Sequence, residues 1–335
     1  MERTILGVNV SVGDIFRADG RLQGKIVRTP LLASSWLSAR IGAQVWLKPE
    51  NWQYTGSFKI RGAYNKMAQL SRSERTQGVI TASAGNHAQG VAMAAQELAI
   101  SALVVTPEGT PETKLAGIRQ YGATVVQKGA HYDEAEAIAW TMARESGRVF
   151  IHAYEDAAVV AGQGTVGLEI FRDLANVDTL LIPAGGGGLL CGIGVVARAL
   201  NPAARVIGVQ SEASPAWYQA FRAGAVVDVT YQPTWAEGLL GSIGHENFRL
   251  AKSVVDGIEL VSEAAIREAM LWALQYHHLV LEGSGAVALA YALSHGPQQL
   301  SEQRVAIVLT GGNVDLSRLR QLLTTSSRMS GLNPE

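Results

Sequence analysis

The strongest constraint on the fold of this chain is an alternation of short β-branched runs with longer amphipathic runs. From residue 78 onward, GVITAS, SALVVT, ATVVQK and VFIH predict strands with helices between them, and TLLIPA and RVIGVQ repeat the pattern after Thr179. Strands separated by helices favour parallel βαβ units. We therefore predict an α/β fold of two open, twisted parallel-sheet subdomains with a site in the cleft between them. We expect residues 51–151 to form a small domain inserted into a large domain of residues 1–50 and 152–325.

The balance of charges argues against a nucleic-acid or membrane partner. Lys and Arg number 28 and Asp and Glu 29 in a chain of 335 residues, which leaves no electrostatic footprint for a polyanion. No apolar run approaches the roughly 18 residues of a membrane span, and no secretory signal pattern begins the sequence. The lone cysteine, Cys191, and the absence of an H-x-x-x-H spacing argue against a metal site. We expect a cytoplasmic protein without a metal.

A run of glycines, AGGGGL at residues 184–189, lies directly after a predicted strand and directly before a predicted helix. Glycines at such a turn let backbone N–H groups converge on an anion, and the helix N-terminus adds partial positive charge. Four consecutive glycines exceed what a tight turn alone requires. We therefore predict a phosphate site formed by Gly185, Gly186, Gly187, Gly188 and Leu189.

A dinucleotide interpretation is the alternative from another class. Residues 192–197 match G-x-G-x-x-A, and Glu212 follows at about the spacing of a ribose-binding acid. The match lies inside the predicted helix rather than at the strand–helix turn, where the pyrophosphate would bind. A nicotinamide-dependent oxidoreductase is therefore disfavoured.

Two further glycine-rich turns follow predicted strands. In TASAGNHAQG, at residues 81–90, Ser83, Asn86 and His87 bring polar side chains to one helix N-terminus, which suits a carboxylate. In LTGGNVD, at residues 309–315, Thr310 stands at the end of a strand. Because ligands of open α/β sheets bind outside the carboxyl ends of the strands, we expect these turns to line one crevice.

Lys59 follows Phe58 in NWQYTGSFKIRGA and opens a helical run. Such a lysine is either a solvated helix start or a nucleophile and imine former held in a pocket. A cofactor and a substrate together can occupy a phosphate site, a carboxylate site and a reactive lysine in one cavity. Pyridoxal phosphate (PLP) with an amino acid supplies the phosphate, an aldehyde for Lys59 and the carboxylate.

Six motifs, in this order, resemble those of fold-type II PLP enzymes with a tryptophan synthase β-like fold: ENWQYTGSFKIRGA, SAGNHAQG, AGQGTVGLEI, GGGGL, EGSGA and TGGNVD. The resemblance runs from about residue 27 to about residue 318 and is greatest to the threonine/serine dehydratase and serine racemase group. It implies that Lys59 forms the imine with the cofactor and that Phe58 packs on its ring. It assigns the ring hydroxyl to Asn86 and the pyridine nitrogen to Thr310, where the family often has serine or cysteine.

The resemblance also implies the residues around the substrate. The turn that carries His87 would bind the substrate carboxylate. The loop TWAEGLLGSIGHENF has Gly238, Gly241 and Gly244 as possible hinges, so we expect it to close over the substrate side chain. The residues in these two segments are Ser83, Ala84, Gly85, Asn86, His87, Glu237, Gly238 and Leu239. Glu282, in EGSGA, would lie close to the cofactor, or else it is a helix cap.

The activity that the resemblance implies is a PLP-dependent ammonia-lyase, or dehydratase, that converts a β-hydroxy amino acid such as threonine or serine to a 2-oxo acid and ammonia. A neutral hydroxyl at Thr310 leaves the pyridine nitrogen less protonated than a carboxylate would, which favours prompt β-elimination. The alternatives are a serine racemase and a dehydratase for phenylserine, 3-hydroxyaspartate or a hydroxyectoine-degradation intermediate. We expect a homodimer or homotetramer.

Ala84 separates the lyase from the racemase. Racemisation requires an acid–base group on each face of the substrate, and the serine racemases of this family have a serine directly before Gly-Asn-His. This chain has Ala84 there, and a methyl group transfers no proton. The sequence therefore predicts lyase activity with little racemisation, unless the neighbouring Ser83 substitutes.

Overall fold

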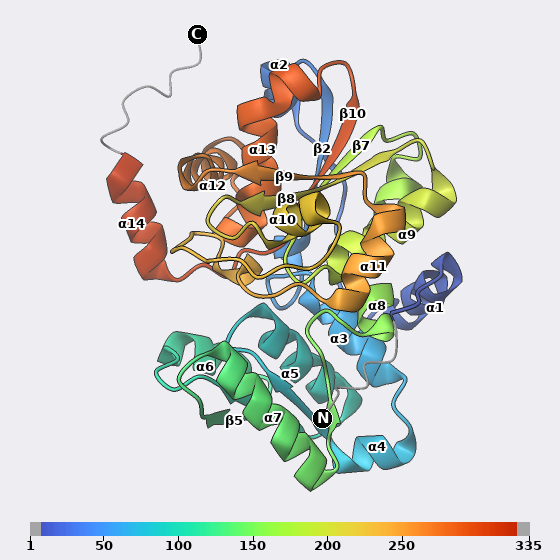
Figure 1. Cartoon of the computed structure of the whole chain (residues 1–335), viewed down its shortest axis with the longest axis vertical. Coiled ribbons are helices and arrows are strands. Elements are labelled where there is room, and N and C mark those ends of the chain that lie inside the picture. Colours follow the sequence, from blue (N-terminus) through green and yellow to red (C-terminus); the bar gives the residue numbers. More distant parts are fainter. Residues whose placement is uncertain (1–7, 327–335) are drawn as a thin grey trace.

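The computed structural model describes residues 8–326, which form two open sheets with helices around and between them (Figure 1). The larger sheet has six strands in the order β1-β2-β10-β7-β8-β9. Its pairs are parallel, except that β1 pairs with β2 in antiparallel fashion. Its strands are β1 (Leu32–Ala33), β2 (Gln44–Pro49), β7 (Thr179–Pro183), β8 (Arg205–Ser211), β9 (Gly257–Val261) and β10 (Arg304–Leu309).

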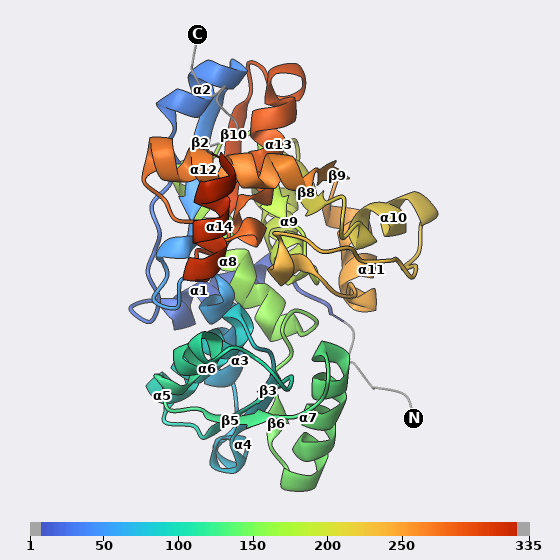
Figure 2. The same cartoon turned by 90° about the vertical axis from the view of Figure 1, so that its left-hand side faces the viewer.

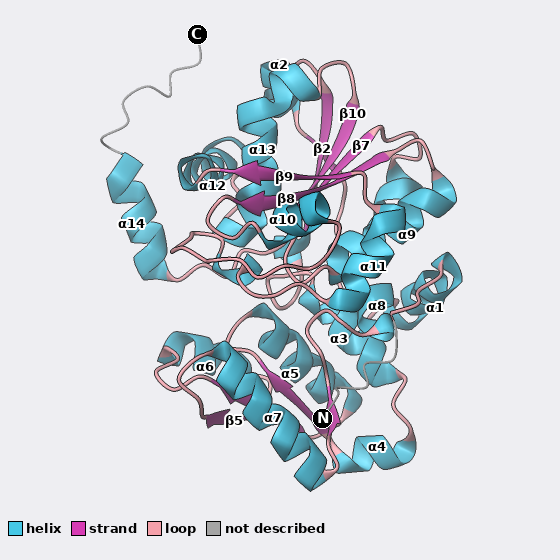
Figure 3. Cartoon of the chain, viewed as in Figure 1, coloured by secondary structure: helices cyan, strands magenta, loops and turns pink. Residues whose placement is uncertain are grey.

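The smaller sheet has four strands in the order β5-β4-β3-β6, and all its pairs are parallel. Its strands are β3 (Val79–Ala82), β4 (Ala102–Thr106), β5 (Thr124–Gln127) and β6 (Val149–Phe150). The two groups of strands lie apart in the molecule, with helices between them (Figure 3). The predicted α/β class with two parallel-sheet subdomains is confirmed, and the short edge strand β1 is the antiparallel addition.

Helices cover both faces of the larger sheet (Figure 2). Leu180 and Ile182 of β7 pack among the helices of one face and Leu181 among those of the other, because successive side chains of a strand point to opposite faces. The first group is α1 (Val12–Leu22), α8 (Ala157–Asp173), α9 (Gly188–Leu200), α10 (Ala216–Ala223) and α11 (His245–Val254). The second is α2 (Ser35–Ile41), α12 (Glu263–His277) and α13 (Gly283–Gln299), with α14 (Leu316–Ser326) beside α12.

The smaller sheet is also covered on both faces. Ile80 of β3 packs with α7, whereas Val79 packs with α3 and α5. The helices of this part are α3 (Lys59–Ala68), α4 (Arg72–Gln77), α5 (Asn86–Leu98), α6 (Glu112–Arg119) and α7 (Tyr132–Ser146). Two 3₁₀ turns, η1 (Glu50–Trp52) and η2 (Glu237–Leu239), belong to the part with the larger sheet.

Helix α3 joins the two parts of the molecule. It packs against α5 on one side and against α8 on the other. The contact with α8 is so close that a Cβ atom on Gly162 would lie 2.6 Å from the carbonyl oxygen of Arg61. The strands of the smaller sheet all come from residues 51–151, and the division of the chain at these residues stays a prediction. No helix of residues 8–326 is long and apolar enough to cross a membrane.

Candidate active site

A cavity of about 630 Å³ lies at the carboxyl ends of β3, β7 and β10, between the two sheets. Residues that are far apart in the sequence meet there because parallel strands end at the same edge of a sheet. All the residues that the sequence predicts for the site line this cavity: Phe58, Lys59, Ser83, Ala84, Gly85, Asn86, His87, Gly185, Gly186, Gly187, Gly188, Leu189, Glu237, Gly238, Leu239, Glu282 and Thr310.

The glycine cradle, residues 185–189, connects the end of β7 to the start of α9. Its carbonyl groups are held from behind: Trp217 Nε1 donates to the Gly185 oxygen, and Asn247 Nδ2 donates to the Gly186 oxygen at 2.9 Å. Within residues 8–326, the backbone N–H groups of the cradle have no protein acceptor. Free N–H groups at a helix N-terminus suit a phosphate, so the cradle fits the predicted anion.

Close packing explains why the cradle consists of glycine. A Cβ atom on Gly186 would lie 2.2 Å from a ring carbon of Tyr154, and one on Gly187 would lie 2.5 Å from the indole of Trp217. Gly187 also has a φ of +100°, which side chains rarely adopt. A Cβ atom on Gly188 would lie 3.0 Å from the backbone oxygen of Tyr154, and one on Gly185 would lie 3.2 Å from a methyl group of Leu239. A tight turn alone would have required only Gly187, so the other glycines serve the close approach of neighbouring residues to the cradle.

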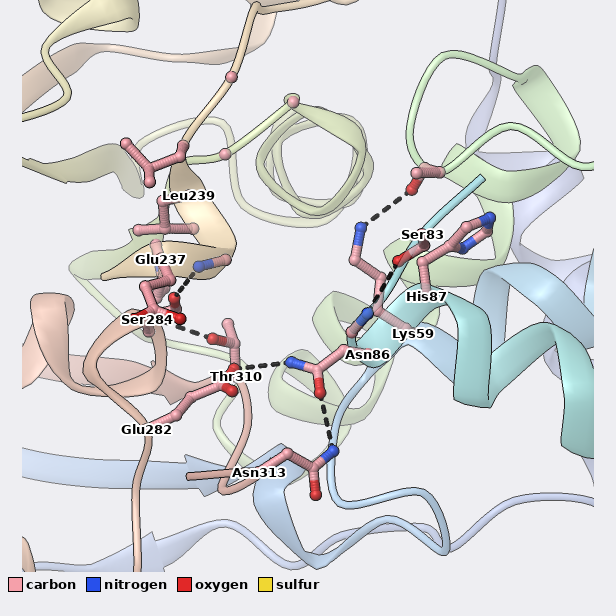
Figure 4. Close-up of a pocket in the computed structure, with 18 of the residues that line it drawn as sticks. Lys59, Ser83, Asn86, His87, Glu237, Leu239, Glu282, Ser284, Thr310 and Asn313 are labelled. Atoms are coloured by element: carbon pink, nitrogen blue, oxygen red, sulfur yellow. Dashed lines mark hydrogen bonds between the residues drawn. The ribbon is translucent and has the colours of Figure 1, made fainter. Parts of the chain in front are cut away.

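Lys59 is the first residue of α3, and its side chain extends into the cavity (Figure 4). Its Nζ donates to the backbone oxygen of Ala153 at 3.0 Å and lies 5.3 Å from the centroid of the Phe58 ring. Burial lowers the pKa of the Lys59 ammonium to about 8, although the charge of Glu282 acts in the opposite direction. A lysine that gives up its proton this readily can act as a nucleophile and as a base.

Three side chains from different segments, Asn86, Glu282 and Asn313, form a hydrogen-bonded row, and Asn86 lies beside Lys59 (Figure 4). Asn86 Nδ2 donates to Glu282 Oε1, and Asn313 Nδ2 donates to Asn86 Oδ1, both at 2.7 Å. Glu282 occupies the N-cap position of α13, but its side chain makes no capping hydrogen bond. The helix-cap alternative is therefore wrong. Burial raises the pKa of the Glu282 carboxyl to about 7, against the effect of the hydrogen bond from Asn86.

The substrate turn, residues 83–87, connects β3 to α5. Ser83 Oγ accepts a hydrogen bond from the Gly85 N–H at 3.2 Å, so this hydroxyl is tied to its own turn. His87 Nε2 lies 3.0 Å from the carbonyl oxygen of Ile151; because a carbonyl only accepts, Nε2 carries the hydrogen. Burial lowers the pKa of the His87 imidazole to about 3, so the ring is neutral. The turn therefore offers N–H groups and a helix N-terminus to a carboxylate.

Thr310 directly follows β10 and faces the cavity. Its hydroxyl donates to the carbonyl oxygen of Ser284 at 3.3 Å. A hydroxyl that has donated its hydrogen keeps its lone pairs free to accept. The side chain therefore presents a neutral partner, not a carboxylate, to whatever group lies against it.

Glu237 lies at the rim rather than at the centre of the cavity. Its carboxylate accepts a hydrogen bond from Arg318 of α14 at 2.6 Å and lies 3.6 Å from Lys114 Nζ of α6. Its neighbour Gly238 donates its N–H to Ser284 Oγ at 2.8 Å, and Leu239 is buried. The ion pair with Lys114 shows that Glu237 links the two parts of the molecule across the mouth of the cavity.

Sequence patterns did not reveal several residues that shape the site. Tyr154, Trp217 and Asn247 follow β6 or belong to α10 and α11, and no motif marks them as neighbours of the cradle. Asn313 was detectable, because an amide in the glycine-rich turn TGGNVD resembles the polar residues of the substrate turn.

The arrangement fits PLP on two independent grounds. The cradle holds N–H groups without protein acceptors, as a phosphate requires, and Lys59 provides an amine with a lowered pKa in the same cavity. The cradle connects β7 to α9 in the part of the molecule with the larger sheet, whereas Lys59 begins α3. The cofactor would therefore be held at its phosphate by one part of the molecule and at its aldehyde by the other.

Comparison with known proteins agrees with this fit. The family model described as pyridoxal-phosphate dependent enzyme matches residues 22–311. The L-threonine ammonia-lyase of Thermotoga maritima is 42% identical over 323 residues, which cover 96% of this chain and 80% of that protein. The processed threonine deaminase isoform 2 of Solanum lycopersicum has a TM-score of 0.88 at 32% identity, covering 98% of this chain and 92% of that one. Maize serine racemase has a TM-score of 0.90 at 31% identity, covering 96% and 98%.

The residues that the family model matches include every strand of both sheets, Lys59, the substrate turn and the glycine cradle. The dinucleotide alternative has no comparable support, since residues 192–197 lie within α9 and away from its N-terminus. The predicted fold type, cofactor and enzyme class are confirmed. The chain belongs to the family of pyridoxal-phosphate-dependent enzymes, in the group that contains the threonine dehydratases and serine racemases.

Proposed function

We propose that this protein is an ammonia-lyase that converts threonine, and serine by the same steps, to a 2-oxo acid and ammonia. One observation carries the proposal: the cavity has one amine with a lowered pKa, that of Lys59, while the substrate turn presents the methyl group of Ala84. A site with one base removes the α-proton and allows the β-hydroxyl to leave. The similarity to enzymes named threonine ammonia-lyase and threonine deaminase supports the same reaction.

The protein's own groups have separate roles in this proposal. The glycine cradle binds the cofactor phosphate, Asn86 contacts the ring hydroxyl, and Thr310 contacts the ring nitrogen. Bound PLP supplies an aldehyde that takes up an amine and a conjugated ring that accepts the electrons of the broken Cα–H bond. The substrate turn orients the carboxylate, which places the α-hydrogen towards Lys59.

Lys59 acts as the general base. Its amine accepts the α-proton, and a pKa near 8 gives a substantial neutral fraction at neutral pH. Loss of the α-proton and of the β-hydroxyl removes one water, and later addition of one water releases ammonia. Threonine thereby becomes 2-oxobutanoate and serine becomes pyruvate, with atoms in balance.

A 2-oxo acid assay with a panel of substrates tests the proposal. The panel contains threonine, serine, phenylserine and 3-hydroxyaspartate, and the control is Lys59→Ala. We expect the yellow protein to form a 2-oxo acid from threonine and to lose its colour on borohydride treatment. Inactivity on the whole panel, with the cofactor bound, would overturn the proposal. A clear preference for phenylserine or 3-hydroxyaspartate would assign the specialised dehydratase instead.

A serine racemase is the second candidate, and the similarity to maize serine racemase favours it. One feature opposes it: Ala84 provides no proton. The neighbouring Ser83 hydroxyl accepts from Gly85 N–H and keeps its own hydrogen, so an assay for the D-isomer measures whether Ser83 takes over this role. A homodimer or homotetramer in the cytoplasm remains our proposal for the state of the protein, and light scattering of the purified holoenzyme measures the subunit number.

A further inference from the structure

A buried charge cluster lies on α3, on the side away from the cavity. Its four members are Lys48, Glu50, Arg61 and Glu169, with exposed fractions of 0%, 0%, 0% and 3%. Two of them are cations and two are anions, so the cluster as a whole is neutral. Three of these residues belong to the part of the molecule that carries the larger sheet, on β2, η1 and α8, and only Arg61 belongs to α3.

Arg61 is the centre of this cluster, because each of its donors has an acceptor. Its Nε and one terminal nitrogen donate to the two oxygens of Glu50, both at 2.7 Å. The terminal nitrogens also donate to the two oxygens of Glu169, at 2.7 and 2.9 Å. The remaining bond goes to Thr165 Oγ1 at 3.1 Å. The planar guanidinium group of Arg61 is bound by a carboxylate on two of its edges, so it has only one orientation. The single ammonium group of a lysine cannot make these paired hydrogen bonds.

The cluster matters for Lys59 because Arg61 belongs to the same first turn of α3. Phe58, at the N-cap position, has no side-chain capping bond. The first turn is held by backbone bonds, from Phe58 N to the Thr310 oxygen at 3.2 Å and from Arg61 N to the Phe58 oxygen at 3.0 Å. Lys59 itself makes one hydrogen bond, to the oxygen of Ala153. The Gly62 N–H donates to Gln163 Oε1 at 3.1 Å. Among the side chains of this turn, that of Arg61 makes the most hydrogen bonds to other elements, and four of its five go to carboxylate oxygens.

A buried cluster of this kind is poor evidence for stability, since removal of four charges from water opposes their attraction. Its geometric effect is clearer: it allows a single placement of α3 relative to β2 and α8. Lys59 and Arg61 lie in the same helical turn, so a rotation of this turn would move the Lys59 amine within the cavity.

We propose that Arg61 is a positioning residue for Lys59: its bonds to Glu50, Glu169 and Thr165 fix the first turn of α3 and thereby aim the amine at the cofactor aldehyde and the substrate α-hydrogen. The proposal rests on the proposed role of Lys59. It assigns a task to the buried charges in the motif ENWQYTGSFKIRGA that do not line the cavity.

The test measures amine exchange in the holoenzyme rather than turnover alone. Glycine lacks a β-hydroxyl, so mixing it with the holoenzyme reports only how fast the substrate amine replaces Lys59 on the cofactor, followed by visible absorption in a stopped-flow instrument. We expect Arg61→Lys to slow this exchange about 100-fold, the effect of a misplacement of about 1 Å, with little change in the dissociation constant of glycine. The matched control is Arg172→Lys, which alters a bidentate ion pair of α8 with Asp19 at the surface.

A milder pair of variants covers the case in which Arg61→Lys does not fold. Thr165→Val removes one acceptor of Arg61, and Thr165→Ser retains the hydroxyl. We expect exchange to be slowed about 3- to 10-fold in Thr165→Val and to be restored in Thr165→Ser. If either Arg61→Lys or Thr165→Val lowers the melting temperature but exchanges glycine at the normal rate, Arg61 has a structural role only and the proposal is overturned. Because exchange requires no elimination, this result is distinguishable from a failure of the lyase assay.

Discussion

Lys48 and Lys59 are near neighbours in the sequence, and both are withdrawn from bulk water, yet the structure gives them opposite surroundings. Lys48 is fully buried, and its Nζ contacts a carboxylate oxygen of Glu169 and the backbone oxygen of Thr29, each at 2.5 Å. Lys59 faces a cavity, and the backbone oxygen of Ala153 is the one hydrogen-bond acceptor of its amine among the described residues.

The comparison teaches that burial alone does not make a lysine reactive. Burial lowers the pKa of both ammonium groups, and at Lys48 the charges of Glu169 and Glu50 oppose that effect directly. At Lys59 the opposing charge is that of Glu282, whose own pKa is raised to about 7. A carboxylate that is itself reluctant to ionise stabilises a neighbouring cation poorly. The lysine without a firm anionic partner, beside open space, is the one available for chemistry.

The largest expected effect is the loss of activity in Lys59→Ala. Without this amine, the protein has neither an attachment for the aldehyde nor a base for the α-proton, so kcat should fall by at least about 1000-fold. The melting temperature of the cofactor-free protein should not fall, because a partly desolvated charge is removed. Borohydride treatment followed by mass spectrometry should detect a cofactor adduct in the parent protein and none in the variant. An adduct on another lysine would show that Lys59 is not the lysine that binds the cofactor.

Lys48→Met should lower the stability of the protein but leave the cofactor adduct at Lys59 intact. It leaves Glu169 with one cationic partner fewer in a buried place, which costs about 3–5 kcal/mol of unfolding free energy. Denaturant titration measures this loss. The protein that remains folded should still form the borohydride-stable adduct at Lys59. An unchanged denaturation midpoint would contradict a structural role for Lys48.

Glu282→Gln tests the role of the carboxylate whose charge acts on Lys59. We expect kcat to fall about 10- to 100-fold, since the row Glu282–Asn86 loses its charge beside the cofactor ring. Stability above pH 7 should not fall, because the carboxylate is desolvated and the amide is not charged. Assays and thermal unfolding of the same preparation give both quantities, and equal losses of the two would favour a structural role.

The lowered pKa of Lys59 should be visible in how the unfolding free energy of the cofactor-free protein depends on pH. Its pKa is about 8 in the folded state, below the value of about 10.4 in an unfolded chain. Between these values the unfolded chain binds more protons than the folded one, so unfolding free energy should rise with pH, by on the order of 2 kcal/mol. Below pH 8 the two states bind the proton equally and this contribution is flat. Urea titrations from pH 7.5 to about 10 should lose this rise in Lys59→Met.

The smallest effect concerns Ala84→Ser. A hydroxyl in the substrate turn adds an acid–base group opposite Lys59, so the variant should form D-isomer from unreacted L-serine while it still binds the cofactor. Lyase activity should change by less than about 10-fold. Chiral chromatography measures the isomers, with the parent protein, whose Ala84 has no hydroxyl, as the control. Abundant D-isomer from the parent protein would show that Ser83 already provides this proton.

Much of the site was predictable because its parts are local. The four glycines of the cradle, the polar turn before α5 and the lysine after Phe58 each follow from a short sequence, and the strand alternation places their turns at one edge. The row from Glu282 to Asn86 was less accessible. The sequence left open whether Glu282 caps a helix, and the 2.7 Å contact with Asn86, far away in the chain, decided against the cap.

By itself, the sequence determined the α/β class, the three glycine-rich strand ends and the kind of ligand they suit, because periodicity and turn chemistry are local properties. Tertiary structure alone decided that Tyr154 and Trp217 enclose the cradle, that Glu237 is tied to Arg318 and Lys114 at the rim, and which lysine has a carboxylate partner. These outcomes depend on packing between elements distant in sequence. A pKa in particular depends on the distances to charges that only the folded chain brings near.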